Sequence, residues 1–179
     1  MGKRRLIGKI VILMLGLAAV VILAANSDTI PVSTHKNGYR VVIDPGHGGS
    51  DCGAVGVSGV KEAGLNLAVS LYLKEELEAL GMEAILTRSD ERALAEGKKA
   101  DMAARGKIMN GEGVDLVVSV HMNKFTDPSV HGPMAFYMKG SAEGEKLAKT
   151  VIDSITDELG APRRIANPGD YYVTVSYTH

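Results

Sequence analysis

The sequence is poor in the residues that mark disulfide-rich or nucleic-acid-binding proteins. Its 179 residues include a single cysteine, Cys52, so no disulfide can form within the chain. Aromatic residues make up 4% of the chain and the formal net charge is −1. No run of lysine and arginine is interleaved with aromatic residues, which argues against a nucleic-acid partner. The apolar fraction of 45% is ordinary for a globular domain, although one N-terminal segment raises it.

Several catalytic and nucleotide-binding motifs are also absent. There is no HExxH, which excludes a metalloprotease with its ligands on one helix, and no GxSxG, so a serine nucleophile has little support. The glycine-rich stretch GHGGSDCG at 46–53 matches neither GxGxxG nor GxxxxGK followed by Ser or Thr, which argues against a phosphate-binding loop. Glycines around a histidine instead let backbone and substrate approach the imidazole closely.

The longest apolar run, the sixteen residues of Ile10–Ala25, predicts export from the cytoplasm. A basic segment at 3–9 precedes it, and the two together have the form of an export signal. Large aliphatic residues two positions before Ala24 and Ala25 make a poor cleavage site, so residues 1–25 are predicted to be an uncleaved signal anchor. A cleaved signal, and hence a secreted protein, is the alternative. The basic residues should stay in the cytoplasm, so the rest of the chain is expected outside the membrane.

After a polar linker at 26–38, short apolar runs alternate with amphipathic segments. Strands are predicted at Arg40–Ile43, Met82–Thr87, Val114–Val120 and Pro133–Met138, and helices at Glu62–Leu80, Lys99–Asn110 and Ala142–Leu159. Residues 171–179 begin like another strand. The alternation predicts an α/β fold, with a twisted, mostly parallel sheet and helices on both faces. The run at 114–120 is apolar enough for a strand covered on both sides.

Two of these strands are followed by a histidine. His47 follows the first strand in VVIDPGHGG, and His121 follows VDLVVSV. Because the two strands are predicted to be parallel neighbours, both imidazoles should lie at one edge of the sheet. The helix that Glu62 opens should begin over that edge. Two imidazoles and a carboxylate can hold a catalytic zinc ion and leave one tetrahedral position open.

Each residue also has a simpler interpretation. A histidine in a turn can be satisfied by backbone hydrogen bonds, and Glu62 in a first helical turn complements the helix dipole. Asp44 and Asp51 either orient His47 through its second ring nitrogen or cap the turn. Cys52 could ligate zinc, although a small buried thiol is commoner. From these residues alone, a metal site and a structural cluster both remain open.

Several separated motifs occur in a fixed order along the chain. They are IDPGHGG-x-D-x-GA-x-G at 43–56, Glu62 followed by Leu-Asn-Leu at 65–67, Leu86-Thr87-Arg88, Arg105 with Asn110, and Ser119-x-His121-x-Asn123. This set resembles the zinc-dependent N-acetylmuramoyl-L-alanine amidases of the amidase-3 type. The short anchor, the brief linker and the lack of cell-wall-binding repeats most resemble the CwlD-like sporulation amidases.

The resemblance implies Zn²⁺ held by His47, Glu62 and His121. It also implies hydrolysis of the amide between N-acetylmuramic acid and L-alanine in peptidoglycan, during cell-wall or spore-cortex remodelling. Peptidoglycan and the membrane are the expected partners, with no nucleic acid and with an activating protein left open. The alternative is a catalytically inactive module of the same fold that binds peptidoglycan or a partner.

The sequence departs from the family at its C-terminal end. The general base of these amidases is a glutamate in a later strand, within a pattern like P-x-x-L-V-E-x-G-F, which residues 1–179 do not contain. We therefore expect a catalytic domain at 39–173 that lacks the family's last strand and helix, and an impaired activity. Residues 174–179 do not resemble amidase sequence and are expected to be a non-native tail. No catalytic residue is assigned.

Overall fold

The computed structural model describes residues 38–125, 127 and 129–169, which fall into two compact units divided after Lys124. The predicted signal anchor, all but the last residue of the linker, the strand expected from Tyr171 and the tail at 174–179 lie outside the described residues. In the described part of the chain, no helix is long and apolar enough to cross a membrane.

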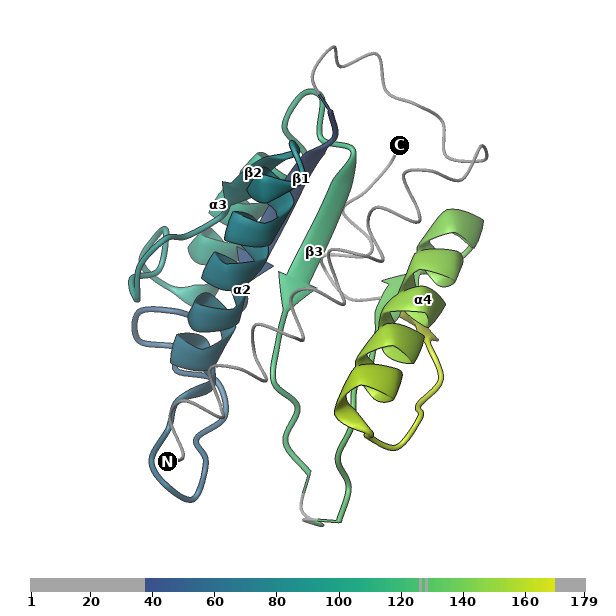
Figure 1. The fold of residues 1–179 in the computed structure, drawn as a ribbon. Helices are drawn as coiled ribbons and strands as arrows, with labels where there is room; N and C mark the ends of the chain where they lie inside the picture. The colour runs from purple at the N-terminus through teal and green to yellow at the C-terminus, as the bar shows by residue number, and fades with distance from the viewer. Residues whose placement is uncertain (1–37, 126, 128, 170–179) are drawn as a thin grey trace. The chain divides into compact units, whose positions relative to one another are not determined.

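A three-stranded parallel sheet forms the centre of the first unit (Figure 1). Strand β1 (Arg40–Pro45) lies between β2 (Glu83–Leu86) and β3 (Leu116–Val120). The β-branched residues at 41–43 are 0–1% exposed, as expected for a strand covered on both faces. The predicted pairing of the first strand with the strand before His121 is confirmed, with Val41 opposite Leu116 and Pro45 opposite Val120.

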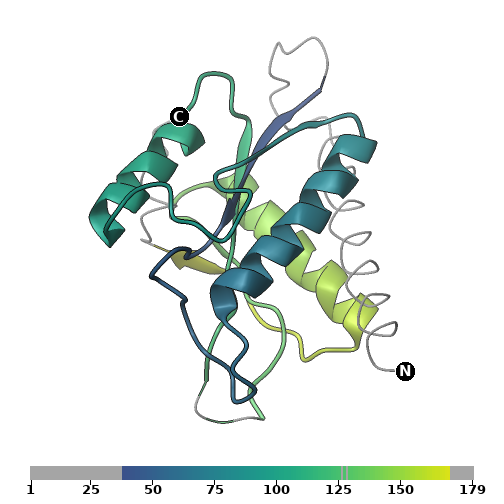
Figure 2. The same cartoon turned by 90° about the vertical axis from the view of Figure 1, so that its left-hand side faces the viewer.

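Helices α2 (Glu62–Ala79) and α3 (Lys98–Met109) cover opposite faces of this sheet, as both views show (Figures 1 and 2). The parallel sheet with helices on both faces is therefore confirmed. Apolar residues at helical spacing in this segment predict a buried stripe at 65, 69, 72/73, 77 and 80. This prediction is partly wrong, because Leu65 is 44% exposed and Leu80 is 38% exposed. The first turns instead bury the polar residues Glu62, Asn66 and Ser70 together with Leu67, and the buried leucines Leu73 and Leu77 follow further along the helix.

Strand β3 differs from its prediction in burial. All five of its residues are only partly buried. The physical reason is its place in the sheet: β3 is an edge strand of the three strands described in this unit, so only β1 pairs with it and no strand of this unit covers its other edge. The apolar run therefore predicted the strand correctly, but the prediction that both of its faces are buried is wrong.

The second unit contains helix α4 (Ala142–Leu159) and two short parallel strands, β4 (Phe136–Met138) and β5 (Asn167–Gly169). The bounds predicted for α4 are confirmed, and Ser141 caps it by accepting a hydrogen bond from the N–H of Gly144 at 3.0 Å. The helix ends at Gly160, whose φ of 59° is left-handed. Strand β5 was not predicted, because the sequence Asn-Pro-Gly is typical of a turn.

Candidate metal centre

The carboxyl ends of β1 and β3 bring the two predicted histidines together. The N–H of Gly46 donates to the carbonyl of Val120 at 3.0 Å, which extends the pairing of the strands to the residues beside His47 and His121. The two imidazole rings are 4.8 Å apart between centroids, at an interplanar angle of 80°. The prediction that both rings lie at one edge of the sheet is confirmed.

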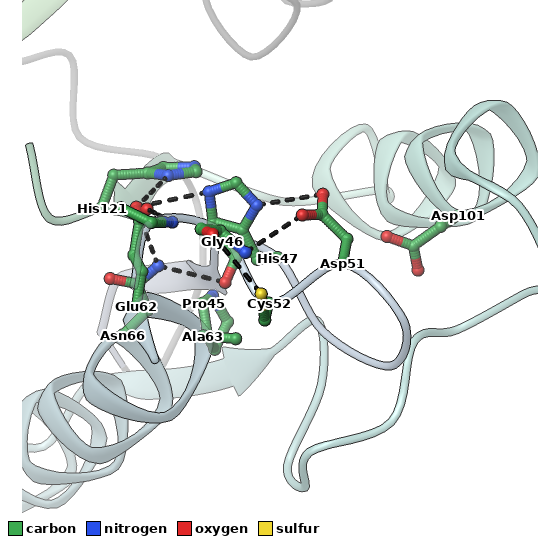
Figure 3. Close-up of polar contacts among 12 residues, drawn as sticks. Pro45, Gly46, His47, Asp51, Cys52, Glu62, Ala63, Asn66, Asp101 and His121 are labelled. Carbon is green, nitrogen blue, oxygen red and sulfur yellow. Dashed lines mark hydrogen bonds and ion pairs between the residues drawn. The ribbon is translucent and has the colours of Figure 1, made fainter. Parts of the chain in front are cut away.

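Glu62, at the first turn of α2, lies between the two rings (Figure 3). Its Oε1 atom is 3.0 Å from His121 Nδ1 and 3.3 Å from His47 Nε2. The backbone N–H groups of Ala54 and Met122 also donate to this carboxylate, at 2.8 and 3.0 Å. The side chain is only 7% exposed. All three side chains predicted as ligands therefore converge on one point.

The environment of Glu62 keeps its carboxyl group ionised. Burial raises the pKa of Glu62, but the N–H of Ala54, the His121 ring and the N–H of Met122 lower it by more. The resulting pKa lies below the ordinary value for glutamate. A charged carboxylate between two imidazoles is the state in which a divalent cation can be bound.

The distances between Glu62 and the two rings are close to those of a zinc site. One ligand atom from each of the three side chains can be chosen so that all lie within 4.8 Å of one another. Two ligand atoms each about 2.0–2.1 Å from a tetrahedral zinc ion are about 3.3 Å apart. The distances of 3.0 and 3.3 Å between Glu62 and the two rings are close to this value. The donor set and these two distances therefore fit zinc, and three ligands leave the fourth tetrahedral position open.

Two glycines make the close packing of these side chains possible. A Cβ atom at Gly46 would lie 2.2 Å from Cε1 of the His121 ring. A Cβ atom at Gly53 would lie 2.7 Å from both Glu62 Oε2 and His47 Cδ2. The glycine-rich stretch therefore gives the ligands space, in agreement with the sequence argument against a phosphate-binding loop.

The substitution Gly46→Ala is expected to displace His121 and to weaken zinc binding. The loss in affinity should be at least as large as that from removing an outer-shell partner, which is about 10–100-fold. The measurement is zinc affinity of the G46A protein by competition with a chromophoric chelator. Gly64→Ala is the matched control, since a Cβ there meets nothing within 4 Å. Equal zinc affinities of G46A and the unchanged protein would contradict the prediction.

Of the two aspartates proposed to orient His47, only Asp51 does so. Its Oδ2 atom is 3.0 Å from His47 Nδ1, which directs the Nε2 atom of that ring towards Glu62. The hydrogen bond with His47 also lowers the pKa of Asp51. Asp44 does not orient His47, because its carboxylate faces α3 and binds Arg105 instead, at 2.8 Å.

The weaker candidate Cys52 does not join the cluster. Its thiol contacts the carbonyl of Gly53 at 3.5 Å and is partly exposed. A further histidine, His131, belongs to the second unit, where its exposed ring contacts the carbonyl of Ser129 at 2.8 Å.

Three buried polar residues beside the ligands were not assigned a role from the sequence. Asn66 is 0% exposed and donates from Nδ2 to the carbonyl of Gly46 at 3.1 Å and to Glu62 Oε1 at 3.4 Å. Arg88 and Arg105 are 3% and 1% exposed and bind the backbone around His47. A role for Asn66 beside the ligands could have been predicted from its position one turn after Glu62, on the same face of α2.

Comparison with known proteins agrees with this geometry. Residues 41–178 match the Amidase_3 family model, described as N-acetylmuramoyl-L-alanine amidase. The germination-specific N-acetylmuramoyl-L-alanine amidase of Bacillus subtilis (strain 168) is 34% identical over 137 residues, which are 72% of this chain and 57% of that protein. AmiA of Escherichia coli (strain K12) is 33% identical over 126 residues, 70% of this chain and 42% of that protein. The chain thus spans about half the length of these relatives.

A solved structure has the same fold. It is that of the CwlD amidase from Clostridioides difficile in complex with the GerS lipoprotein, with a TM-score of 0.71, 27% sequence identity, and coverage of 76% of this chain and 75% of that one. The resemblance inferred from the ordered motifs is therefore confirmed at the level of the family. The chain belongs to the Amidase_3 family of N-acetylmuramoyl-L-alanine amidases.

Proposed function

We propose that this protein is a zinc-dependent amidase that hydrolyses the bond between N-acetylmuramic acid and L-alanine in peptidoglycan. His47, Glu62 and His121 are the zinc ligands of this proposal. The observation that carries it is the convergence of two imidazoles and one carboxylate from three segments distant in sequence, with Glu62 at 3.0 and 3.3 Å from the two rings. Membership of the amidase family supplies the substrate class.

A zinc ion held there would supply Lewis-acid chemistry, by polarising the carbonyl of the scissile amide and lowering the pKa of a water molecule. The protein's own contribution is to hold the ligands in place. The N–H groups of Ala54 and Met122 orient the Glu62 carboxylate, and Asp51 orients the His47 ring. The side chain of His121 is 48% exposed, so the cluster is open to substrate on that side.

The proposal includes a slow reaction for residues 1–179 on their own. The two carboxylates that the described residues bring to the cluster are Glu62 and Asp51, and imidazoles engage both. Neither is free to take a proton from an attacking water molecule. A missing general base reduces the rate by about 10²–10⁴-fold.

We therefore expect the 179-residue polypeptide to bind one zinc ion per chain and to release new amino termini from muropeptides about 10²–10⁴-fold more slowly than the B. subtilis relative. Metal content is measured by mass spectrometry, and amide hydrolysis by labelling of the new amino groups. A chain without zinc would contradict the metal site. A rate equal to that of the relative would contradict the role given to the family glutamate.

A second candidate is a catalytically silent module that binds peptidoglycan or a partner. Imidazoles engage both nearby carboxylates, which leaves neither of them to act as a general base and favours this second function. Zinc binding would then have a structural role. Retention of the protein on purified peptidoglycan, without any release of amino termini after long incubation, distinguishes this function from slow hydrolysis.

The location and partners are part of the same proposal. We infer that residues 1–25 anchor the protein in the membrane, that residues 26–38 link the anchor to the catalytic domain at 39–173, and that this domain acts on the outer side. The basic residues before the apolar run support this orientation. The similar C. difficile amidase was solved in complex with a lipoprotein, which supports an outer-surface protein partner.

A further inference from the structure

The turn that carries His47 presents three successive backbone carbonyls to buried arginines. The carbonyl of Pro45 accepts from Arg88 Nε at 2.9 Å and from Arg105 Nη1 at 2.7 Å. The carbonyl of Gly46 accepts from Arg88 Nη2 at 3.0 Å. The carbonyl of His47 accepts from Arg105 Nη2 at 2.6 Å. The backbone on both sides of the His47 Cα atom is therefore held by guanidinium groups.

His47 needs such support because of its own backbone. Its φ angle is 63°, in the left-handed region, and no other non-glycine residue of the described ranges has a positive φ. This conformation is strained for a residue with a Cβ atom and persists only where the surroundings determine it. It directs the His47 ring towards Glu62, so loss of the conformation would move a ligand.

The two arginines have different partners. Arg105 pairs with the carboxylates of Asp44 and Asp101, at 2.8 and 2.7 Å. Within the described residues, every hydrogen-bond acceptor of Arg88 is a backbone carbonyl, namely those of Pro45, Gly46, Ala63 and Asp90. Burial lowers the pKa of Arg88, and the nearby Arg105 lowers it further. Burial of this cation costs free energy, which its hydrogen bonds to carbonyls and the nearby charges of Asp44, Asp101 and Asp90 offset.

The hydrogen bonds of Arg88 connect two of the ligand-bearing segments. Arg88 Nη2 donates to the carbonyl of Gly46 at 3.0 Å and to the carbonyl of Ala63 at 2.8 Å. Gly46 directly precedes His47, and Ala63 directly follows Glu62. One nitrogen atom therefore fixes the separation of the two backbones that carry these ligands. A lysine ammonium would keep the charge but has no planar fork with which to make the remaining bonds of Arg88 at the same time.

We propose that Arg88 is a positioning residue of the metal centre, whose guanidinium sets the distance between His47 and Glu62 before any metal binds. This inference rests on the proposed metal-binding function. It assigns Arg88 no contact with substrate or with the metal. Arg88 acts on the metal affinity through the backbone segments that carry the ligands.

The test compares the full chain with its R88K variant. Zinc affinity, measured by competition with a chromophoric chelator, is expected to fall about 10–100-fold, the usual effect of losing an outer-shell partner. The visible spectrum of the Co²⁺-substituted variant is expected to lose intensity as the tetrahedral geometry is distorted. The control is Arg40→Lys, because Arg40 binds Glu83 and the carbonyl of Glu112 at the other end of β1.

The thermal unfolding of the metal-free variant separates positioning from general stability. Zinc affinity should fall in R88K while the metal-free protein remains folded, and R40K should bind zinc normally. Normal zinc affinity in R88K, or an equal loss in R40K, would overturn the positioning role alone. An unchanged chain that binds no zinc would overturn both this role and the proposed function.

A second measurement applies even if R88K does not fold. In the unchanged chain, the Nε–H and Nη–H signals of Arg88 are followed by NMR without metal and with zinc. A positioning residue is expected to keep slowly rotating, hydrogen-bonded Nη groups in both states. A guanidinium that rotates freely until zinc is added would overturn the proposal.

Discussion

Replacement of His121 by alanine is expected to abolish stoichiometric zinc binding. The ring supplies one of the three ligand atoms, and Glu62 Oε1 lies 3.0 Å from its Nδ1 atom. With one imidazole and one carboxylate left, the zinc affinity should fall by more than the roughly 10–100-fold loss that removal of an outer-shell group causes. Peptidoglycan hydrolysis should fall to the background rate with it.

The measurement is the zinc content of H121A after dialysis against a metal-buffered solution, together with release of amino termini. Since the side chain of His121 is 48% exposed, its removal leaves the buried sheet intact. Unfolding of the metal-free protein should therefore be nearly unchanged. His131→Ala is the control, because that exposed ring contacts the carbonyl of Ser129 and belongs to the second unit. Full zinc occupancy in H121A would remove the basis of the proposed function.

Replacement of Asp44 by alanine is expected to destabilise the first unit by about 3–5 kcal/mol, the usual effect of removing one partner of a buried ion pair. Asp44 is 2% exposed and accepts hydrogen bonds from Thr87 at 2.6 Å, Arg105 at 2.8 Å and Ser119 at 3.0 Å. Burial lowers the pKa of Arg105, but Asp44 and Asp101 raise it above its ordinary value. Without Asp44, the buried guanidinium keeps its charge and loses its most buried partner.

Chemical denaturation of the metal-free protein, followed by circular dichroism, measures this change in the free energy of unfolding. The matched control is Glu83→Ala, which removes a carboxylate from an arginine at the other end of β1. That pair is 2.8 Å long, with side chains 30% and 56% exposed, and such surface pairs contribute about 0–1 kcal/mol. Equal losses in the two variants would mean that the buried pair has no special role in stability.

The elements that carry the site could be predicted because their signals are local. The β-branched run before His47, the helical periodicity after Glu62 and the apolar run before His121 each identify one element. The rule that parallel strands end at the same edge then brings the ligands together. Partners that depend on packing between elements could not be predicted in this way. Arg88 and Arg105 are buried charges, and neither a period nor a motif indicates which carbonyls they bind.

The error in the apolar stripe of α2 has its physical origin in the ligand cluster. Helical spacing predicted that Leu65 faces the sheet, whereas the inner face of α2 begins with Glu62, Asn66 and Ser70. A polar inner face is stable there because Glu62 and Asn66 find partners in the turn after β1. Apolar periodicity identifies a buried face only where burial is apolar, and near a ligand cluster that condition fails.

All three proposed ligands lie before Lys124, within the first compact unit. A ribosome that has released only this part of the chain has therefore already delivered all three proposed ligands. The proposed ligand set is complete before the residues after Lys124 are synthesised.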